Sequence, residues 1–442
     1  MSSETIKSFL ASAIDSVSAD IGKYSFQPEK DFTRPGKLPP DKLISFLIGM
    51  GSSSTRNDLY DFFGLSPDTR PTPSAFTQQR AKLKPEALEA VLKDFNAAVD
   101  PAPPHFRFIA ADGSTATFQS SSKHASDAFF VDQGHSQKGF FSIHINALYD
   151  LDLHTYKDAL LQPVHNKDEF RAFCDMVDRY PIPADTNSKI VFIGDRGYCS
   201  YNNMAHVRCK GQYFLFRTKD SNKKGLIGNF DLPDSDSFDV DIDVSLCRRN
   251  SSKFHSENRY LRFIGKEVSF DFIEYGSDDL FDLSFRVVRF PLKDGSYECI
   301  VTDLPRDRFP SDEIKKLYFR RWGIETSFRK LKYTIGLSNF HSRKPVHVCQ
   351  EIWARMIMYN YTETLINQTV INTSGTKHTY KVNFSVAAHI CRLSLRLAAE
   401  AEPIDVISLL QQELIPVRDD RQFQRLKTAH FRKPRHFIYR AA

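Results

Sequence analysis

Long hydrophobic segments are absent from the sequence. Its 442 residues contain no run of 18 apolar residues, and the first residues lack the basic-then-apolar pattern of a signal peptide. These absences exclude a membrane-spanning helix and argue against secretion. We therefore expect no membrane partner and a location in the cytoplasm, including the nucleoid.

Cysteines and metal-binding motifs are also scarce. Seven cysteines are scattered along the chain without a Cys-x-x-Cys pair, and the 14 histidines form no His-Glu-x-x-His motif. This pattern excludes a disulfide framework and a zinc ribbon, and it indicates reduced, buried thiols.

A strong charge of either sign is missing as well. The net charge is only +6, and 41% hydrophobic with 26% charged residues is typical of an ordinary globular protein. The excess is uneven, because residues 418–442 hold eight Lys or Arg and two Asp, which leaves the rest of the chain neutral. Phe and Tyr are interleaved with the cations of this basic tail. The composition suits contacts with nucleic acid, and it is equally that of a solvated tail without a partner.

The first predicted domain, residues 1–100, has helical patterns. Apolar segments over 40–50 and 55–63 end at glycines, and Thr72-Pro73 has the cap-then-proline pattern of a helix start. Short helices joined by tight turns suit a helix-turn-helix DNA-binding unit, and they suit equally a small helical bundle with a solvated polar face. In the first case the third helix would read DNA through Ser74, Gln78, Gln79, Arg80 and Lys82.

The second predicted domain, residues 105–220, follows a Pro-rich linker and alternates between strands and helices. Three β-rich runs come first, over 106–112, 115–118 and 139–151. A helix, a buried strand, a helix and a strand follow, over 168–180, 189–195, 201–210 and 213–217. This order predicts an α/β fold of the ribonuclease H-like class.

Three further segments complete the predicted organisation. Residues 221–302 form a β-rich insertion, which begins with strict alternation and ends with a hairpin turn. Residues 303–340 contain a strong helix that starts near Ser311 and stops at Gly336. Residues 341–442 are a helical C-terminal region with the basic tail.

The helix that starts near Ser311 carries the most informative pattern. At about 100° per residue, Tyr318, Arg321, Glu325 and Lys332 fall within one stripe on a helix, beside an apolar stripe that faces a core. One face would thus present a carboxylate, two cations and a phenol. An ordinary amphipathic helix with a pair between Glu325 and Arg329 is the alternative.

Two aspartates follow apolar strand patterns. Asp112 comes after the first β-rich run, and Asp195 ends the buried strand. An unpaired buried carboxylate costs several kcal/mol (roughly), so these positions suggest a site, although helix capping is an alternative for each. With Glu325 they would give hard oxygen ligands for two Mg²⁺ ions, with Mn²⁺ as a substitute, a combination that cleaves phosphodiesters.

Tyr318, Arg321, Glu325 and Lys332 match the spacing Tyr-x2-Arg-x3-Glu-x6-Lys, and the chain resembles the DDE transposases of bacterial insertion sequences that carry this signature. The resemblance extends over about residues 30–400. Its other motifs are Phe32-Thr-Arg-Pro-Gly-Lys-Leu38, Thr72-Pro-Ser-Ala-Phe-Thr-Gln-Gln-Arg80, Asp112-Gly-Ser, Gly194-Asp-Arg-Gly-Tyr198 and Asn339-Phe-His-Ser-Arg343, in the family's order.

The resemblance implies a ribonuclease H-like catalytic core interrupted by the β-rich insertion, with Asp112, Asp195 and Glu325 as metal ligands. Such enzymes bind double-stranded DNA at terminal inverted repeats as a homodimer, cut the ends and join the 3′ ends to target DNA. The residues expected to contact DNA near the cut are Tyr318, Arg321, Arg329, Lys330 and Lys332.

One feature departs from part of the family. Members that release DNA through a hairpin stack a flipped base on a Trp near the end of the insertion, where this chain has Tyr297. Tyr297 is a candidate stacking platform, and the hairpin step stays open. Two alternatives to an active transposase also stay open: an inactive or domesticated relative that binds specific DNA sequences, and a nuclease that cleaves without joining strands.

Overall fold

The computed structural model describes most of the chain. The described residues are 1–102, 104–132, 139–182, 187–220, 225–228, 230–250, 261–292, 294–371, 378–396 and 404–417. The basic tail, for which DNA contacts were predicted, lies outside them. All seven cysteines lie within them, and none is joined in a disulfide. Among these residues, no helix combines the length and apolar character that crossing a lipid bilayer requires.

Helices make up the first hundred residues, as the sequence predicts. Side-chain oxygens cap three of them: Ser2 Oγ accepts from Thr5 N at 3.1 Å, Ser54 Oγ from Asn57 N at 3.3 Å and Thr72 Oγ1 from Ala75 N at 3.1 Å. The helices are α1 Ser3–Ala19, α2 Pro40–Gly49, α3 Thr55–Phe63, α4 Pro73–Arg80 and α5 Glu86–Val99.

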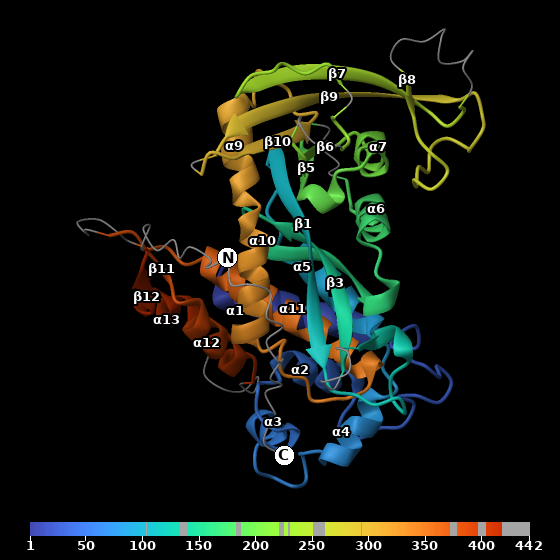
Figure 1. Cartoon of the computed structure of the whole chain (residues 1–442). Coiled ribbons are helices and arrows are strands. Elements are labelled where there is room, and N and C mark those ends of the chain that lie inside the picture. The colour runs from blue at the N-terminus through green and yellow to red at the C-terminus, as the bar shows by residue number, and fades with distance from the viewer. Residues whose placement is uncertain are drawn as a thin grey trace.

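A large mixed sheet forms the centre of the molecule (Figure 1). Its strands are β1 Phe106–Phe118, β2 Phe130–Val131, β3 Phe140–Asp150, β4 Thr155–Pro163, β5 Lys189–Gly194, β6 Tyr213–Thr218, β7 Phe238–Cys247, β8 Leu261–Phe263, β9 Leu280–Pro291 and β10 Tyr297–Thr302. The order across the sheet is β2-β3-β1-β5-β6-β10-β9-β7-β8, with β4 also on β3. The β1–β5 and β5–β6 pairs are parallel, and β1–β3 and β3–β4 are antiparallel.

The β-rich segment near residues 221–302 continues this sheet. β10 pairs antiparallel with β6 through Cys299 to Thr302, and β9 and β7 extend the sheet outward from β10. The long antiparallel pair of β7 and β9 crosses one end of the molecule in Figure 1. The segment is therefore β-rich, as predicted, and it is joined to the core by main-chain hydrogen bonds.

Helices cover both faces of the sheet (Figure 1). α6 Glu169–Arg179 and α7 Tyr201–Cys209 pack on one face, and α11 Pro345–Asn367 packs on the other. The unbroken apolar sequence of β5 follows from this arrangement. Alternate side chains of β5 enter the two hydrophobic cores, with Ile190 and Phe192 on the α6 side and Val191 and Ile193 on the α11 side.

The predicted helix from Ser311 to Gly336 is divided into three parts. They are α9 Ser311–Arg320, α10 Trp322–Lys330 and a π-helical turn over Leu331–Ile335. The end at Gly336 is as predicted, and glycine is suited to it because φ is 101° there.

The described C-terminal region is helical around α11, with one small two-stranded sheet. Its further elements are β11 Tyr380–Val382, α12 Phe384–Arg396, α13 Val406–Gln412 and β12 Leu414–Pro416. Short 3₁₀ turns lie at Asp127–Phe129, Val164–Asn166 and Arg196–Tyr198.

Candidate active site

The candidate site lies where β5 stops pairing with β1. The last paired residues of the two parallel strands are Ala111 and Gly194, and the next residues are Asp112 and Asp195. The two aspartates therefore follow the last pair of this parallel ladder on neighbouring strands. In open α/β sheets, ligands bind beyond the carboxyl ends of parallel strands.

The position of Asp112 differs from the sequence interpretation. Asp112 does not end a strand, because β1 continues to Phe118 and pairs with β3 along its whole second half. Asp195 does follow the end of β5, and its Oδ1 accepts from Gly197 N at 2.8 Å. This bond opens the 3₁₀ turn at Arg196, so Asp195 also caps a turn, in line with the capping alternative.

Glu325 of α10 and Arg321, the residue before α10, lie near Asp112. Side chains alternate along a strand, so Asp112 lies on the same face as Ala110, in the core that Ile324 of α10 also enters. Arg321 Nη2 donates to Glu325 Oε1 at 2.9 Å, and Arg321 Nη1 lies 3.9 Å from Asp112 Oδ2. Glu325 pairs with Arg321 in place of the alternative partner Arg329.

The three predicted carboxylates affect one another electrostatically. The pKa of Asp112 is raised to about 6, with burial as the largest cause. The Gly113 amide and Arg321 oppose this rise, and the nearby charges of Asp195 and Glu325 add to it. The positive charge of Arg321 therefore does not fully offset the burial and the negative charge around Asp112.

These donors suit a hard divalent cation by type and by charge. Carboxylate oxygens are the ligands that Mg²⁺ and Mn²⁺ prefer, and added positive charge would relieve the repulsion at Asp112. In the arrangement seen, no set of three His, Cys, Asp or Glu side chains among the described residues is close enough to hold an ion. The positive charge that the site does contain is that of Arg321.

Arg321 is buried, and some of its N–H groups make no hydrogen bond within the described part of the chain. Only 4% of its side chain is exposed, and its Nε and Nη1 atoms have no hydrogen-bond partner within the described part of the chain. Its guanidinium carbon lies 5.7 Å from the ring centre of Tyr318 and 5.4 Å from that of Trp322. Tyr318 is itself buried, so it supports Arg321 from the side.

The remaining cations of this helix lie on different sides. Arg329 is exposed, whereas Lys330 Nζ donates to Glu363 Oε1 of α11 at 2.7 Å and so points away from Asp112. Lys332 is half-buried and lies in the π-helical turn. The regular 100° spacing that grouped Lys332 with Glu325 does not apply there, because a π turn holds more residues per turn.

Tyr297 begins β10, in the strand pair with β9. Its hydroxyl donates to Asp236 Oδ1 at 2.5 Å, and the guanidinium of Arg289 covers one face of the ring at 3.9 Å from the ring centre. One face of this candidate stacking platform is therefore already occupied.

Arg80 lies in the interior, away from any surface that could read DNA. Its side chain is 2% exposed, its Nη1 donates to Glu351 Oε1 at 3.1 Å, and its Nε donates to Gln350 Oε1 at 3.1 Å. Arg80 therefore joins α4 to α11, which corrects its placement among the predicted DNA-reading residues.

The other α4 candidates lie nearer the surface. Gln78 is exposed, and its Nε2 donates to Ser74 Oγ at 3.3 Å. Gln79 and Lys82 are half-buried, and Lys82 Nζ lies 5.7 Å from the ring centre of Phe32. Nearby, a polar cavity of about 840 Å³ opens beside the start of α3, lined by residues 52–57, Pro73, Phe340, His341 and Arg343.

Two residues near the site were not identified from the sequence. Glu169 begins α6, and its Oε1 lies 3.2 Å from His144 Nε2 on β3, beside the buried Tyr198. In the sequence, Glu169 followed a helix cap and His144 lay in an apolar run, so neither had a chemical signature. Their proximity depends on the register of β3 against β1.

The sequence of this chain is similar to those of known proteins. The family model described as "Transposase DDE domain" matches residues 103–361. A curated relative, "Transposase InsG for insertion sequence element IS4" of Escherichia coli (strain K12), is 28% identical over 131 residues. That match covers 27% of this chain and 29% of the relative, so the chain spans less than a third of the relative's length.

A solved structure is also similar, at a greater distance. It is described as "Cryo-EM structure of piggyBac transposase synaptic complex with hairpin DNA (SNHP)". The match has a TM-score of 0.44 and 11% identity, and it covers 88% of this chain and 77% of the other. At that score it adds nothing to the interpretation of the site.

Proposed function

The chain belongs to the transposase DDE domain family, whose model matches more than half of it, and from this premise we propose that it is a transposase acting on the ends of its own element. It binds the terminal inverted repeats in double-stranded DNA, cleaves phosphodiester bonds at the ends and joins the 3′ ends to target DNA. The observation that carries the proposal is that Asp195 and Glu325 lie near enough to Asp112 to raise its pKa, while Arg321 contacts both Asp112 and Glu325.

The order of the central strands supports a ribonuclease H-like core. β4, β3, β1, β5 and β6 lie side by side in that order, with α6 between β4 and β5 and α7 between β5 and β6. In this interpretation β7 to β10 are the insertion, and α10 completes the core by supplying Glu325.

Each predicted site residue has a role in the proposed reaction. Asp112, Asp195 and Glu325 would hold two Mg²⁺ ions, or Mn²⁺ in their place, and these ions when bound supply an activated water and stabilise the leaving oxygen. Arg321 presents two N–H groups without partners in the described part of the chain, which suit the non-bridging oxygens of a phosphate. Tyr318 keeps the guanidinium in place from within the core.

The DNA would be held by several surfaces outside the carboxylate cluster. Gln78 and the polar cavity beside α3 lie on the helical N-terminal region. Arg329 is exposed on α10, next to the site. We propose that two copies of the chain hold two element ends together, as a homodimer on DNA.

Replacing the carboxylates tests this function. We expect Asp112→Ala, Asp195→Ala and Glu325→Ala each to reduce Mg²⁺-dependent cleavage of the element's own ends on the order of a thousandfold or more, with DNA binding largely retained. Asp94→Ala, an exposed site on α5, is the matched control. Cleavage is measured on a labelled DNA end, and joining is measured by capture in a target plasmid.

Three results would contradict parts of the proposal. Full cleavage by the Glu325 variant would exclude the predicted triad. Binding of the ends without cleavage by the unaltered chain would indicate the inactive relative, and cleavage without joining would indicate a nuclease.

A further inference from the structure

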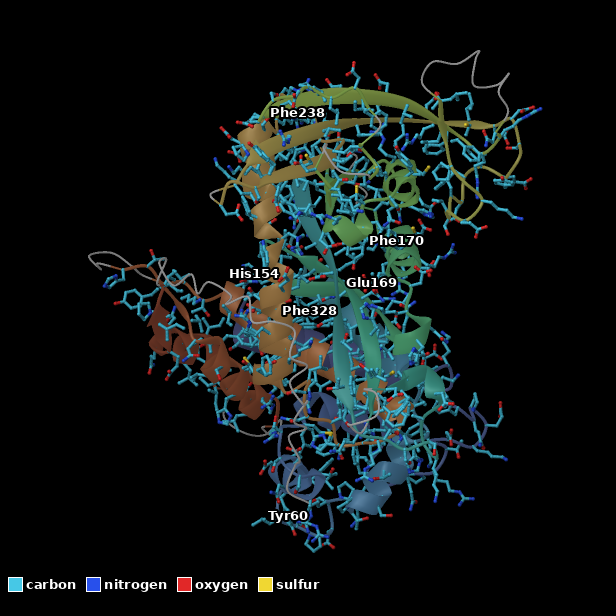
Figure 2. All side chains as sticks on the ribbon, viewed as in Figure 1. Tyr60, His154, Glu169, Phe170, Phe238 and Phe328 are labelled. Atoms are coloured by element: carbon cyan, nitrogen blue, oxygen red, sulfur yellow. The ribbon has the colours of Figure 1, made fainter. Side chains whose placement is uncertain are left out.

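A fourth carboxylate lies at the edge of the sheet that holds Asp112 and Asp195. It is Glu169, the first residue of α6, which Figure 2 labels beside the central strands. α6 covers the face of the sheet opposite α10. Because β5 ends at Gly194, β1 has no parallel neighbour beyond Ala111, and side chains from both faces can reach this edge.

Two glycines show how close Glu169 lies to the aspartates. A methyl group placed on Gly113 would lie 3.6 Å from Glu169 Oε1, and one placed on Gly197 would lie 3.9 Å from Glu169 Oε2 and 3.1 Å from Asp195 Oδ1. The two oxygens of Glu169 thus lie near Gly113, which follows Asp112, and near Gly197, two positions after Asp195. Small residues at both positions leave room for this carboxylate.

His144 lies beside the Glu169 carboxylate, close enough for an ion pair, and its Nε2 makes no hydrogen bond within the described part of the chain. His144 lies on β3 opposite Thr115, so it shares the α6 face with Gly113, and its side chain is 5% exposed. Its Nε2 lies 3.2 Å from Glu169 Oε1, and a methyl group on Gly113 would lie 2.8 Å from the same nitrogen. The absence of a side chain at Gly113 is therefore required for His144 to reach Glu169.

A buried hydroxyl beside these carboxylates lacks a partner. Tyr198 is 2% exposed, and within the described part of the chain its Oη makes no hydrogen bond. Burial raises the pKa of Tyr198 well above its usual value, and the negative charges of Asp112, Glu169 and Asp195 raise it further. A polar group left unsatisfied among three carboxylates indicates that the site is completed by something else, such as a hydrated cation.

We propose that Glu169 is a fourth carboxylate of the cation site, which shares a divalent cation with Asp195 and is oriented by His144. The inference rests on the proposed function, because it assumes that Asp112, Asp195 and Glu325 bind divalent cations. His144 is a positioning residue here, since it acts on the cation through Glu169.

A purely structural role for Glu169 has distinct consequences. Glu169 lies in the first turn of α6, where a negative charge is favourable, and Lys167 Nζ lies 3.3 Å from its Oε1. Glu313 has the same local setting, in the first turn of α9 with Lys316 Nζ at 2.6 Å, and it lies on a helix segment away from both aspartates. Glu313→Gln therefore removes the same two helix interactions without touching the site.

The test measures Mn²⁺ binding to the full-length chain by electron paramagnetic resonance of the free ion. We expect Glu169→Gln to weaken Mn²⁺ binding by about tenfold or more, His144→Asn to weaken it less, and Glu313→Gln to leave it unchanged. Thermal unfolding without metal shows that each variant is folded. The rise in midpoint on adding Mn²⁺ is then a second measure of binding, and we expect it to be smaller in Glu169→Gln than in the unaltered chain.

Asp195→Asn separates the two possible failures. If Glu169→Gln binds Mn²⁺ as the unaltered chain does while Asp195→Asn does not, the fourth carboxylate is excluded and the proposed function stands. If Asp195→Asn also binds Mn²⁺ normally, the proposed cation site itself is wrong. A lower metal-free midpoint in Glu169→Gln with an unchanged Mn²⁺ response would assign Glu169 to helix stability alone.

Discussion

Asp112 is a carboxylate that the fold holds in an unfavourable environment. Burial is the largest contribution to its raised pKa, and Asp195 and Glu325 add to it. A carboxylate whose pKa is higher in the folded chain than in the unfolded chain contributes most to stability at low pH. That contribution is lost as the pH rises through the folded value, here about 6.

We therefore expect Asp112→Asn to stabilise the metal-free protein above pH 6. The gain should be on the order of 1 to 3 kcal/mol at pH 8 and should vanish below about pH 3, where Asp112 is protonated in both states. Thermal unfolding in the presence of a chelator, at a series of pH values, measures the difference. Asp94→Asn on α5 is the exposed control and should show no such pH dependence. A gain that is the same at pH 4 and pH 8 would contradict the assignment to Asp112 ionisation.

The buried charges between α4 and α11 are satisfied, in contrast to those at the edge of the sheet. Glu351 accepts from Arg80 Nη1 at 3.1 Å and lies 3.1 Å from His341 Nδ1, while His341 Nε2 lies 3.0 Å from Asp58 Oδ2. Burial alone would raise the pKa of Glu351, yet His341, Arg80 and Arg355 hold it well below its usual range. The network ties the N-terminal helices to the C-terminal region.

Breaking this network should be strongly destabilising. We expect Glu351→Gln to lower the free energy of unfolding by about 3 to 5 kcal/mol, because it leaves the buried charge of Arg80 without its carboxylate. Urea unfolding at neutral pH measures the change. Glu89→Gln removes a more exposed ion pair with Lys93 on α5 and should cost about 0.3 to 0.5 kcal/mol. A loss below about 1 kcal/mol for Glu351→Gln would mean that Arg80 is free to serve another partner.

At the scale of elements, local sequence patterns predicted where helices begin more accurately than they predicted the length of β1. The starts at Thr55 and Pro73 are as expected, since cap residues and proline act locally. Two separate β-rich runs were expected, over 106–112 and 115–118, whereas β1 continues through both. Pairing with β3 keeps the strand continuous, because ten successive residues of β1 find partners there.

The helix that carries Glu325 was also only partly predictable from the sequence. Its first residue and its glycine stop were predictable, whereas its two irregularities were not. At Arg321 the amide donates to Tyr318 O and the carbonyl accepts from Ile324 N, each at 3.1 Å, which tightens the helix between α9 and α10. Nothing in the residue pattern marks the π turn that follows Lys330.

Only some residues of the candidate site could be predicted from local sequence patterns. Asp112, Asp195 and Glu325 could be proposed because each carried a local pattern and together they matched a family signature. Glu169 and His144 could not, since their contact needs the β1–β3 register and the placement of α6 at once. The ion pair of Arg80 joins residues 271 positions apart, a distance over which sequence patterns carry no information about contact.

Across the whole molecule, the two ends of the chain share one core. α11 packs against α1, α2 and α5 from the N-terminal region and against α12 from its own. Asn360 Nδ2 of α11 donates to Asn96 Oδ1 of α5 at 2.9 Å, and both side chains are buried. The helical N-terminal region is thus bound to the central sheet through α11. If both regions contact DNA as proposed, this packing would fix one DNA segment relative to the other.

The charge of the whole chain also follows from its organisation. The net charge of +6 equals the excess in residues 418–442, so the remaining residues are neutral on balance. Many of their acids are paired with arginines within the fold, as Asp239 is with Arg286 and Arg306. A small net charge is therefore compatible with a strongly basic segment at one terminus.

Removing residues 418–442 tests whether this basic terminus binds DNA. For every phosphate that the shortened chain no longer neutralises, the slope of log affinity against log salt concentration should fall by about 0.9, because fewer counterions are released. We expect a flatter slope and weaker binding for the shortened chain, measured by fluorescence anisotropy on labelled duplex at several salt concentrations. A full-length variant with the eight Lys and Arg of this segment replaced by Gln keeps the length and aromatic residues, and should show the same flattening. An unchanged slope in both variants would place the segment away from DNA, and a change in the truncation alone would assign the binding to its aromatic side chains.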